Sequence, residues 1–146
     1  MSGQILLLSG PNLDLLGQRS PEIYGTATLD DHVRAFEAAV ASHGYSVHAV
    51  QSNSEAVLIE TLHAARTSAV AIAFNPGALT HGSWALRDAL EIFTGPKIEI
   101  HLSNPAAREP FRHLSTVAGA VSGSIAGFGG LSYVLAAQAI VALLNA

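Results

Sequence analysis

The chain has 146 residues, which suits one domain. Hydrophobic residues make up 49% of it and charged residues only 12%, against about 25% in an average soluble domain, so we expect much of its surface to be buried in a homo-oligomer. The net charge of -4 and the absence of a Lys/Arg cluster argue against a nucleic-acid partner, and the absence of cysteine excludes disulfides, thiolate nucleophiles and zinc–thiolate sites.

The two ends of the chain lack the patterns of targeting and membrane segments. Residues 1–4 have no basic region of the kind that begins a signal peptide. The apolar run at 131–144 is shorter than a membrane span and contains Gln138, which favours a buried or interface helix. We therefore expect a cytoplasmic protein with a single domain over residues 1–146, in contact with no membrane.

Short apolar runs alternate with helix-like stretches along the chain, which predicts alternating strands and helices. The expected strands lie at residues 5–8, 45–50, 70–74, 98–103 and 121–125. The expected helices lie at about 28–44, 52–65, 83–93, 108–114 and 133–144. Thr28 with Asp31, and Ser52 with Glu55, have the spacing of a capping box at the first two helix starts. This order predicts a flavodoxin-like three-layer α/β fold, with a five-stranded parallel sheet and helices on both faces.

Residues 98–103 carry the strongest local sign of a functional site. Side chains of a strand alternate between its faces, so Glu99 and His101 share one face and stand about 7 Å apart along the strand. A carboxylate and an imidazole in a buried strand are costly unless they bond each other or face a polar pocket. We interpret the pair as a histidine acid or base held in one tautomer by a carboxylate. The plainer alternative is a surface strand with one polar face.

Polar residues also follow three of the expected strands. They are Asn12 after the first, Asn75 with His81 after the third, and His101 with Ser103 at the end of the fourth. The carboxyl ends of parallel strands lie along one edge of a sheet, and we expect a site where these residues converge. Each of these breaks taken alone is equally well explained as a turn.

The loop at residues 10–26 is long for a connection between a strand and a helix, and such loops often serve as lids. It contains Arg19 and Tyr24. A guanidinium within about 4–6 Å of a phenol favours the phenolate, which can act as a base. Alternatively, Tyr24 only packs the loop onto the body of the protein.

Three further features allow more than one interpretation. Arg108 and Arg112 are four residues apart, so a helix would place both on one face, either as a carboxylate clamp or as a solvated face with Glu109. Residues 127–130 resemble a phosphate loop only weakly, and we predict a tight turn there. No metal-ligand spacing is found among the other histidines, so we predict no metal. These are His32, His43, His48, His63 and His113.

Several short motifs follow one another in a specific order. They are GPNL at 10–13, LGQR at 16–19, YG at 24–25, QSNSE at 51–55, NPGALTH at 75–81, ALRD at 85–88, EIHLSN at 99–104 and REPFRH at 108–113. In these motifs the chain, from residue 5 to about 139, resembles the type II 3-dehydroquinate dehydratases. The resemblance implies a lyase that converts 3-dehydroquinate to 3-dehydroshikimate by anti elimination through an enolate. This step belongs to the shikimate pathway, which leads to chorismate and the aromatic amino acids, and also to quinate breakdown.

The resemblance assigns a role to each motif residue. Tyr24 would be the base, next to Arg19 and with Arg112 as a second neighbouring arginine, while Asn12 would hold a water at the enolate. His101, oriented by Glu99, would be the general acid. The residues implied in substrate binding are Asn75, His81, Leu102, Ser103, Arg112 and, from a neighbouring subunit, Asp88. The family's assembly is a dodecamer of four trimers, and neither a cofactor nor a metal is implied.

Four positions depart from what this family usually has. Ser9 stands in place of Asn, Ser20 in place of Glu, Gly82 in place of a small polar residue, and Ser132 in place of Gly. None of them removes the base, the acid or the anion-binding residues, although Ser20 lies beside Arg19 in the expected lid. Two other functions compete with the lyase. One is a non-catalytic paralogue that binds a related hydroxy acid, and the other is a flavin-binding or receiver module of the same fold.

Overall fold

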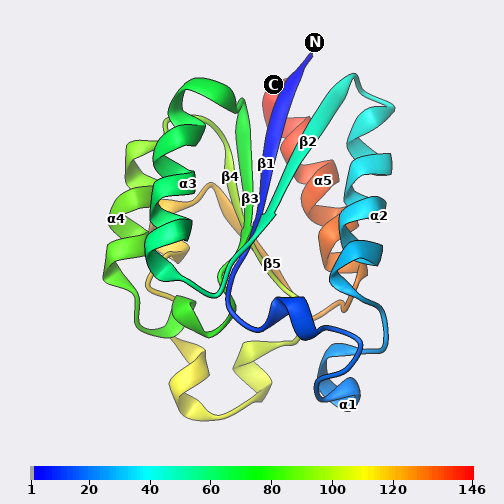
Figure 1. The fold of residues 1–146 in the computed structure, drawn as a ribbon, viewed down its shortest axis with the longest axis vertical. Helices are drawn as coiled ribbons and strands as arrows, with labels where there is room; N and C mark the ends of the chain where they lie inside the picture. The colour runs from blue at the N-terminus through cyan, green and yellow to red at the C-terminus, as the bar shows by residue number, and fades with distance from the viewer. Residues whose placement is uncertain (1) are drawn as a thin grey trace.

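The computed structural model describes residues 2–146, which form one parallel sheet flanked by helices (Figure 1). The strands are β1 (Gly3–Ser9), β2 (Tyr45–Gln51), β3 (Ala71–Asn75), β4 (Lys97–His101) and β5 (Gly123–Ala126). The helices are α1 (Pro21–Tyr24), α2 (Leu29–Ala41), α3 (Glu55–Ser68), α4 (Trp84–Ile92) and α5 (Leu131–Leu144). The strand order is β2-β1-β3-β4-β5 with every pair parallel, so the predicted flavodoxin-like fold is confirmed.

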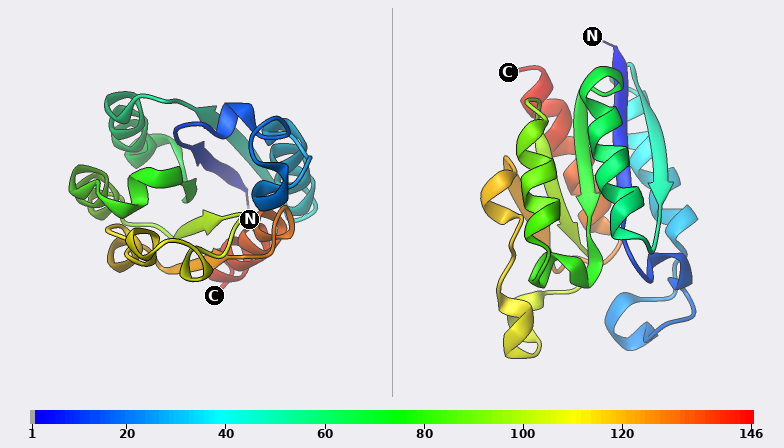
Figure 2. Two further views of the ribbon diagram at one scale, coloured as in Figure 1. Left: turned by 90° about the horizontal axis from the view of Figure 1, so that it is seen from below. Right: turned by 60° about the vertical axis from the view of Figure 1, so that its left-hand side comes forward.

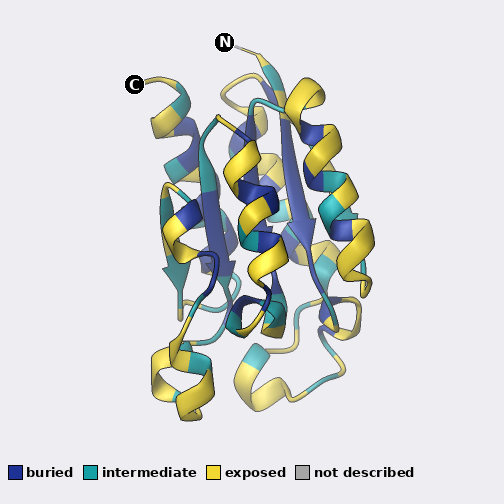
Figure 3. Ribbon diagram, turned by 90° about the vertical axis from the view of Figure 1, so that its left-hand side faces the viewer, coloured by how far each residue is buried: buried dark blue, intermediate teal, exposed yellow. Residues whose placement is uncertain are grey.

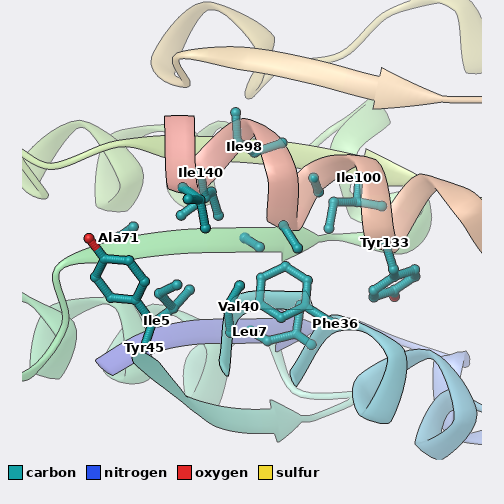
Figure 4. Close-up of a cluster of buried hydrophobic side chains, with 14 of the residues drawn as sticks. Ile5, Leu7, Phe36, Val40, Tyr45, Ala71, Ile98, Ile100, Tyr133 and Ile140 are labelled. Carbon is teal, nitrogen blue, oxygen red and sulfur yellow. The ribbon is translucent and has the colours of Figure 1, made fainter. Parts of the chain in front are cut away.

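Helices cover both faces of the sheet, because successive strand side chains point to opposite sides. α2 and α5 pack on one face, against residues such as Ile5, Leu7 and Ile100 (Figures 2 and 4). α3 and α4 pack on the other face, against Leu6, Leu8 and Phe74. Figure 3 shows the buried strands between helices whose outer surfaces are exposed. Each buried Leu, Ile or Phe side chain contributes about 1.5–3 kcal/mol, so this alternation holds the three layers together.

Five short 3-10 turns connect these elements. They are η1 (Leu13–Leu15), η2 (Gly77–His81), η3 (Pro105–Ala107), η4 (Pro110–His113) and η5 (Ala118–Ala120). The predicted helix at 108–114 is replaced by one 3-10 turn, η4, at Pro110–His113, while Arg108, between η3 and η4, is extended. Pro110 explains the break, since a residue before proline avoids the helical region, and Glu109 accordingly has φ -58° and ψ 147°.

Two helix starts also differ from the prediction. The capping box of Thr28 and Asp31 is confirmed, with both reciprocal hydrogen bonds present. The cap of α3, however, is Ser54 and not Ser52: the Ser54 hydroxyl accepts from the Val57 N–H, whereas Ser52 accepts from Ser54 in the preceding turn. α5 begins at Leu131, two residues before the predicted start.

The carboxyl ends of the strands point to the bottom of Figure 1, where α1 and the segment with η3 and η4 extend below the sheet. The loops after β1 and β3 approach each other closely there. A Cβ atom at Gly10 would lie 2.6 Å from the carbonyl oxygen of Pro76, so only glycine permits this contact. Among residues 2–146, no helix has the length and apolar character needed to cross a membrane.

Candidate active site

A cleft that is partly open to solvent lies at the carboxyl ends of β1, β3 and β4. The residues that line it come from the loop after β1, α1, η2 and the segment after β4. They are Pro11, Asn12, Leu13, Arg19, Tyr24, Asn75, Gly77, Ala78, His81, His101, Leu102, Ser103, Pro105, Arg108 and Arg112. The convergence expected from the sequence is thus present, since residues after three different strands meet in one cleft.

Tyr24 is held at the cleft by two arginines. Nη2 of Arg19 donates to its phenolic oxygen at 3.2 Å, and Nη1 of Arg108 donates to the same oxygen at 2.9 Å. The Arg19 guanidinium also lies over the tyrosine ring, 4.1 Å from its centroid. The phenolic oxygen of Tyr24 thus accepts hydrogen bonds from two cationic donors.

The second arginine at Tyr24 is Arg108, and not Arg112 as the sequence had suggested. Arg112 pairs with Glu109 at 3.2 Å instead. Arg108 reaches the phenol because it lies in extended backbone between η3 and η4, and it also donates to Ser103 at 3.3 Å. The sequence did offer Arg108 as half of a clamp, but a regular helix would not have separated it from Arg112.

Asn12 enters the cleft in the left-handed backbone conformation, with φ 70°. Its N–H donates to Oδ1 of Asn53 at 2.9 Å, and Nε2 of Gln51 donates to the same oxygen at 3.2 Å. Non-glycine residues in this conformation often mark functional sites, and asparagine tolerates it best. Asn53 and Gln51 therefore fix the position of Asn12. The sequence alone did not predict this role for either residue.

Asn75 forms the floor of the cleft and is 2% exposed. Its Oδ1 accepts from the Gly77 N–H at 3.1 Å, and its Nδ2 donates to the hydroxyl of Tyr133 at 3.2 Å. Burial raises the pKa of Tyr133, and hydrogen bonds from Asn75 and Ser9 only partly offset that effect, so Tyr133 is neutral. Ser9, one of the four departures, thus contacts this buried tyrosine.

Behind this floor, His32 stacks on Tyr133 with ring centroids 5.1 Å apart. The imidazole is 5% exposed, and its Nε2 atom has no hydrogen-bond partner within the described residues. Burial lowers the pKa of His32, with a smaller opposing effect of the Asp31 charge. His32 is therefore a neutral core residue and not a ligand.

Glu99 and His101 are in direct contact, as their spacing in β4 predicted. Nε2 of His101 lies 2.5 Å from Oε2 of Glu99, whose side chain is 2% exposed. Burial raises the pKa of Glu99, but hydrogen bonds from His101, Thr80 and Ser115, together with the histidine charge, outweigh it and leave the pKa below its ordinary value. The carboxylate is therefore ionised, and it can orient the imidazole and stabilise its charged form.

The imidazole of His81 is fixed by a hydrogen bond at its Nδ1 atom. Its Nδ1 lies 2.8 Å from the carbonyl oxygen of Leu114, and because a carbonyl only accepts, Nδ1 must carry a proton. The edge of the ring also contacts Phe111 in a T-shaped arrangement, 5.8 Å between centroids. The neighbouring departure, Gly82, has open space around it, so the loop that carries His81 does not depend on glycine there.

The other expected site residues divide into two groups. Leu102 and Ser103 line the cleft directly after β4. Asp88 is exposed on α4 and does not line the cleft of its own chain. Of the remaining departures, Ser20 begins α1 with φ 31° and makes no side-chain cap bond, while the Ser132 hydroxyl accepts from the Phe128 N–H at 3.1 Å.

In the turn at residues 127–130, the backbone N–H groups of the first three residues all have hydrogen-bond acceptors. The N–H groups of residues 127, 128 and 129 donate to His101, Ser132 and Leu102 respectively. A phosphate loop needs these groups for its ligand, so the predicted tight turn is confirmed. Within residues 2–146, no three histidine, aspartate or glutamate side chains are placed to hold a metal ion.

Known proteins are similar to this chain in sequence and in fold. The family model for class II dehydroquinases matches residues 3–141. A 3-dehydroquinate dehydratase of Caulobacter vibrioides is 54% identical over 142 residues, which cover 97% of each chain. One from Xanthomonas euvesicatoria is 52% identical over 142 residues, covering 97% of this chain and 96% of its own.

Solved structures agree with this relationship. The type II dehydroquinase of Propionibacterium acnes superimposes with a TM-score of 0.90 at 43% identity, covering 97% of this chain and 98% of its own. That of Butyrivibrio crossotus gives a TM-score of 0.92 at 37% identity, with 95% and 97% covered. The chain therefore belongs to the class II dehydroquinase family.

Proposed function

We propose that the protein is a lyase that dehydrates 3-dehydroquinate to 3-dehydroshikimate, with Tyr24 as the base and His101 as the general acid. One arrangement carries the proposal: a phenol with two arginine donors shares a cleft with an imidazole backed by a buried carboxylate. A base and an acid in one cleft are what an elimination requires, since one group removes a proton and the other protonates the leaving hydroxyl. Family membership supports the same activity, because the curated relatives are named 3-dehydroquinate dehydratase.

The first step is removal of a proton from the carbon next to the substrate ketone. The Tyr24 phenolate, stabilised by Arg19 and Arg108, takes this proton, and the electron pair moves onto the ketone oxygen to give an enolate. A water bound to Asn12 would donate a hydrogen bond to the enolate oxygen. The strained, fixed backbone of Asn12 supports that task, because a preorganised donor needs no rearrangement during the reaction.

The second step is loss of the C1 hydroxyl. The enolate electrons re-form the ketone and create the carbon–carbon double bond, while the imidazolium of His101 protonates the departing hydroxyl, which leaves as water. Ionised Glu99 stabilises the imidazolium before transfer and keeps Nε2 occupied, so the proton comes from Nδ1. Tyr24 ends with a proton and His101 lacks one, and exchange with solvent restores both.

The residues around the acid and base are suited to an anionic, hydroxylated substrate. We propose that Asn75, His81 and Ser103 bind its hydroxyl groups and that Arg112 binds its carboxylate, next to Leu102. A guanidinium suits this role because it can donate two parallel hydrogen bonds to a carboxylate. Arg112 would exchange part of its contact with the exposed Glu109 for the substrate.

Asp88 can take part only from a second copy of the chain, because it lies outside its own cleft. Its neighbour one turn earlier on α4, Trp84, is 59% exposed, and residues four apart share a helix face. An apolar side chain of this size next to Asp88 supports burial of that face against another protomer. We propose that this contact belongs to a homododecamer of four trimers in the cytoplasm.

The proposal is tested by mixing purified protein with 3-dehydroquinate and following the ultraviolet absorbance of the conjugated enone carboxylate. The expected result is a rise whose rate is proportional to enzyme concentration. Isothermal titration with the same compound separates the alternative, a non-catalytic paralogue that binds a hydroxy acid. Binding with no absorbance change at any protein concentration would favour the paralogue and contradict the lyase.

Substrate deuterated on one face of the carbon next to the ketone tests the stereochemistry. Anti elimination predicts that deuterium on the face opposite to the one from which the hydroxyl leaves is lost to solvent, whereas deuterium on the same face is retained in the product. Mass spectrometry of the product distinguishes the two outcomes. Retention of the label from the opposite face would contradict the anti course while leaving the dehydratase activity intact.

A further inference from the structure

The carboxylate of Glu99 is surrounded by hydroxyl donors from three separate segments. Thr80, in η2, donates to Oε2 at 2.6 Å. Ser115, between η4 and η5, donates to Oε1 at 2.9 Å, and Ser124, in β5, lies 3.4 Å from the same oxygen. Together with His101, these groups fill the hydrogen-bonding capacity of a side chain that is almost fully buried.

The hydroxyl protons of this cluster are shared among few acceptors. The Thr80 and Ser115 hydroxyls lie 2.8 Å apart, and either can donate to the other, while the Ala118 N–H donates to the Ser115 oxygen at 3.0 Å. Because each hydroxyl has a single proton, at least one of the two donates to Glu99. The pKa of Glu99 lies below its ordinary value, so the carboxylate is ionised and only accepts, and the contact with His101 then needs a proton on Nε2. The ring atom left for the cleft is then Nδ1.

We propose that Thr80 and Ser115 are positioning residues that hold His101 in this tautomer by keeping Glu99 ionised and in place. The inference rests on the proposed function for its kinetic consequences, and it deepens the role of the acid. Neither hydroxyl lines the cleft with Tyr24, so both act through Glu99 and not on the substrate. His101 opposes the effect of burial on the Glu99 pKa most strongly, and the two hydroxyls add to it, so their loss would raise the Glu99 pKa and release the carboxylate from two of its contacts.

The same segment also fixes the second histidine of the cleft. The Leu114 carbonyl accepts from Nδ1 of His81, and Thr116 binds the Thr80 carbonyl through both its N–H and its hydroxyl. Residues 114–116 therefore connect η2 to the end of β4 at consecutive positions. The ring orientations of His81 and His101 therefore both depend on contacts made by residues 114–116.

Other charges near Glu99 must be considered before a pH effect is assigned to it. His101 lies on its own strand, His81 on η2, and Arg112 and His113 on η4, and all four line a second pocket together with Glu99. Two of these, Arg112 and His113, are turned to partners in their own segment, Glu109 and the Arg108 carbonyl. The hydroxyls of Thr80 and Ser115 contact the carboxylate directly, and their removal changes no formal charge, which makes them suitable for substitution.

The experiment uses Thr80→Val, Ser115→Ala and the double variant, with Thr80→Ser as the conservative rescue. Thr116→Val is the matched control, because it removes a buried hydroxyl next to Ser115 that does not touch Glu99 while the Thr116 N–H still binds Thr80. Circular dichroism and thermal unfolding establish that each variant is folded. The acidic limb of log kcat against pH and the ring-nitrogen NMR shifts of His101 in protein without substrate are then measured.

The acidic limb should move to higher pH by about one unit for each hydroxyl removed, since a hydrogen bond to a charged group corresponds to about one pKa unit or more. On the shifted acidic limb kcat should fall with KM nearly unchanged, and the NMR shifts should reveal a mixture of His101 tautomers in the double variant. Thr80→Ser should restore the wild-type profile, and Thr116→Val should lower stability only.

An unchanged acidic limb together with an unchanged Nε2–H tautomer in the folded variants would overturn the proposal. If the double variant does not fold, the two single variants test the proposal instead. Each should move the acidic limb by half of the shift expected for the double variant. The NMR measurement also separates this inference from the proposed function. Wild-type protein without dehydratase activity would contradict the function, while the tautomer would still report whether Thr80 and Ser115 position His101.

Discussion

Nη1 of Arg108 lies 2.9 Å from the phenolic oxygen of Tyr24, although 84 positions separate the two residues in the chain. The contact connects the loop after β1 to the segment after β4. Arg19 approaches the same oxygen from within the loop. Both arginines can therefore bind the phenolic oxygen only when the loop lies against the body of the protein.

Replacement of Arg108 by methionine should reduce kcat about ten- to a hundred-fold, because one hydrogen bond from a charged donor is worth about 1.5–3 kcal/mol. The loss should fall on kcat, because Arg108 contacts the phenolic oxygen of the proposed base. Steady-state kinetics measures kcat and KM separately. Arg34→Met, which alters an exposed ion pair on α2 with Asp30, is the matched control. An unchanged kcat in Arg108→Met would contradict a role for Arg108 at the base.

The stability of the protein should depend on Glu99 at acid pH. The pKa of Glu99 in the folded protein is below its ordinary value of 4.5. The ionised carboxylate therefore contributes to the free energy of unfolding above pH 4.5, and this contribution is lost as the pH falls toward the folded-state pKa. Urea unfolding of wild type and Glu99→Gln between pH 6 and pH 3 tests this. The variant should lose less free energy of unfolding than wild type across that range, and parallel curves would contradict the assignment.

A second pH effect should come from His32. Its pKa is lowered by burial from 6.5, so the unfolded chain binds a proton more readily than the folded one as the pH drops below 6.5. The stability gained from the neutral ring is therefore complete above that pH and is lost on acidification. His32→Phe keeps a ring against Tyr133 and should flatten the curve between pH 6.5 and 5. If the slope in this window were the same in both proteins, His32 would not be its source.

Tyr133→Phe should weaken the floor of the cleft. The change removes the acceptor of the Asn75 side chain and leaves a buried amide donor unsatisfied, which costs about 1–3 kcal/mol. We expect a lower free energy of unfolding together with a raised KM, because the amide that faces the substrate loses its orientation. Tyr45→Phe removes a hydroxyl that binds Asn145, far from the cleft, and should leave KM unchanged. An unaltered KM in Tyr133→Phe would indicate that Asn75 is oriented by Gly77 alone.

The fold and the acid pair could be predicted because they depend on local patterns. The alternation of apolar runs is enough for a parallel sheet, and a two-residue spacing in a strand is enough to bring Glu99 to His101. The segment after β4 was not predictable in the same way. Residues 108 and 112 have helical spacing, but Pro110 divides the segment and only Arg108 reaches Tyr24.

The support around the acid could not be read from the sequence either. Thr80 and Ser115 lie 19 and 16 positions from Glu99, in turns whose geometry depends on tertiary packing. Nothing local distinguishes their hydroxyls from those of other surface turns. Asn53 is a similar case, because its contact with Asn12 spans 41 positions and links the loops after β1 and β2.

Tyr24 is the proposed base, and the Tyr24→Phe variant decides whether it has this role. Phenylalanine keeps the ring beneath Arg19 but removes the only oxygen that accepts from both arginines. The enone absorbance assay should show turnover reduced by at least about a thousand-fold, in line with the loss of a general base, while isothermal titration still detects binding of 3-dehydroquinate. Near wild-type turnover by Tyr24→Phe would show that Tyr24 is not the base.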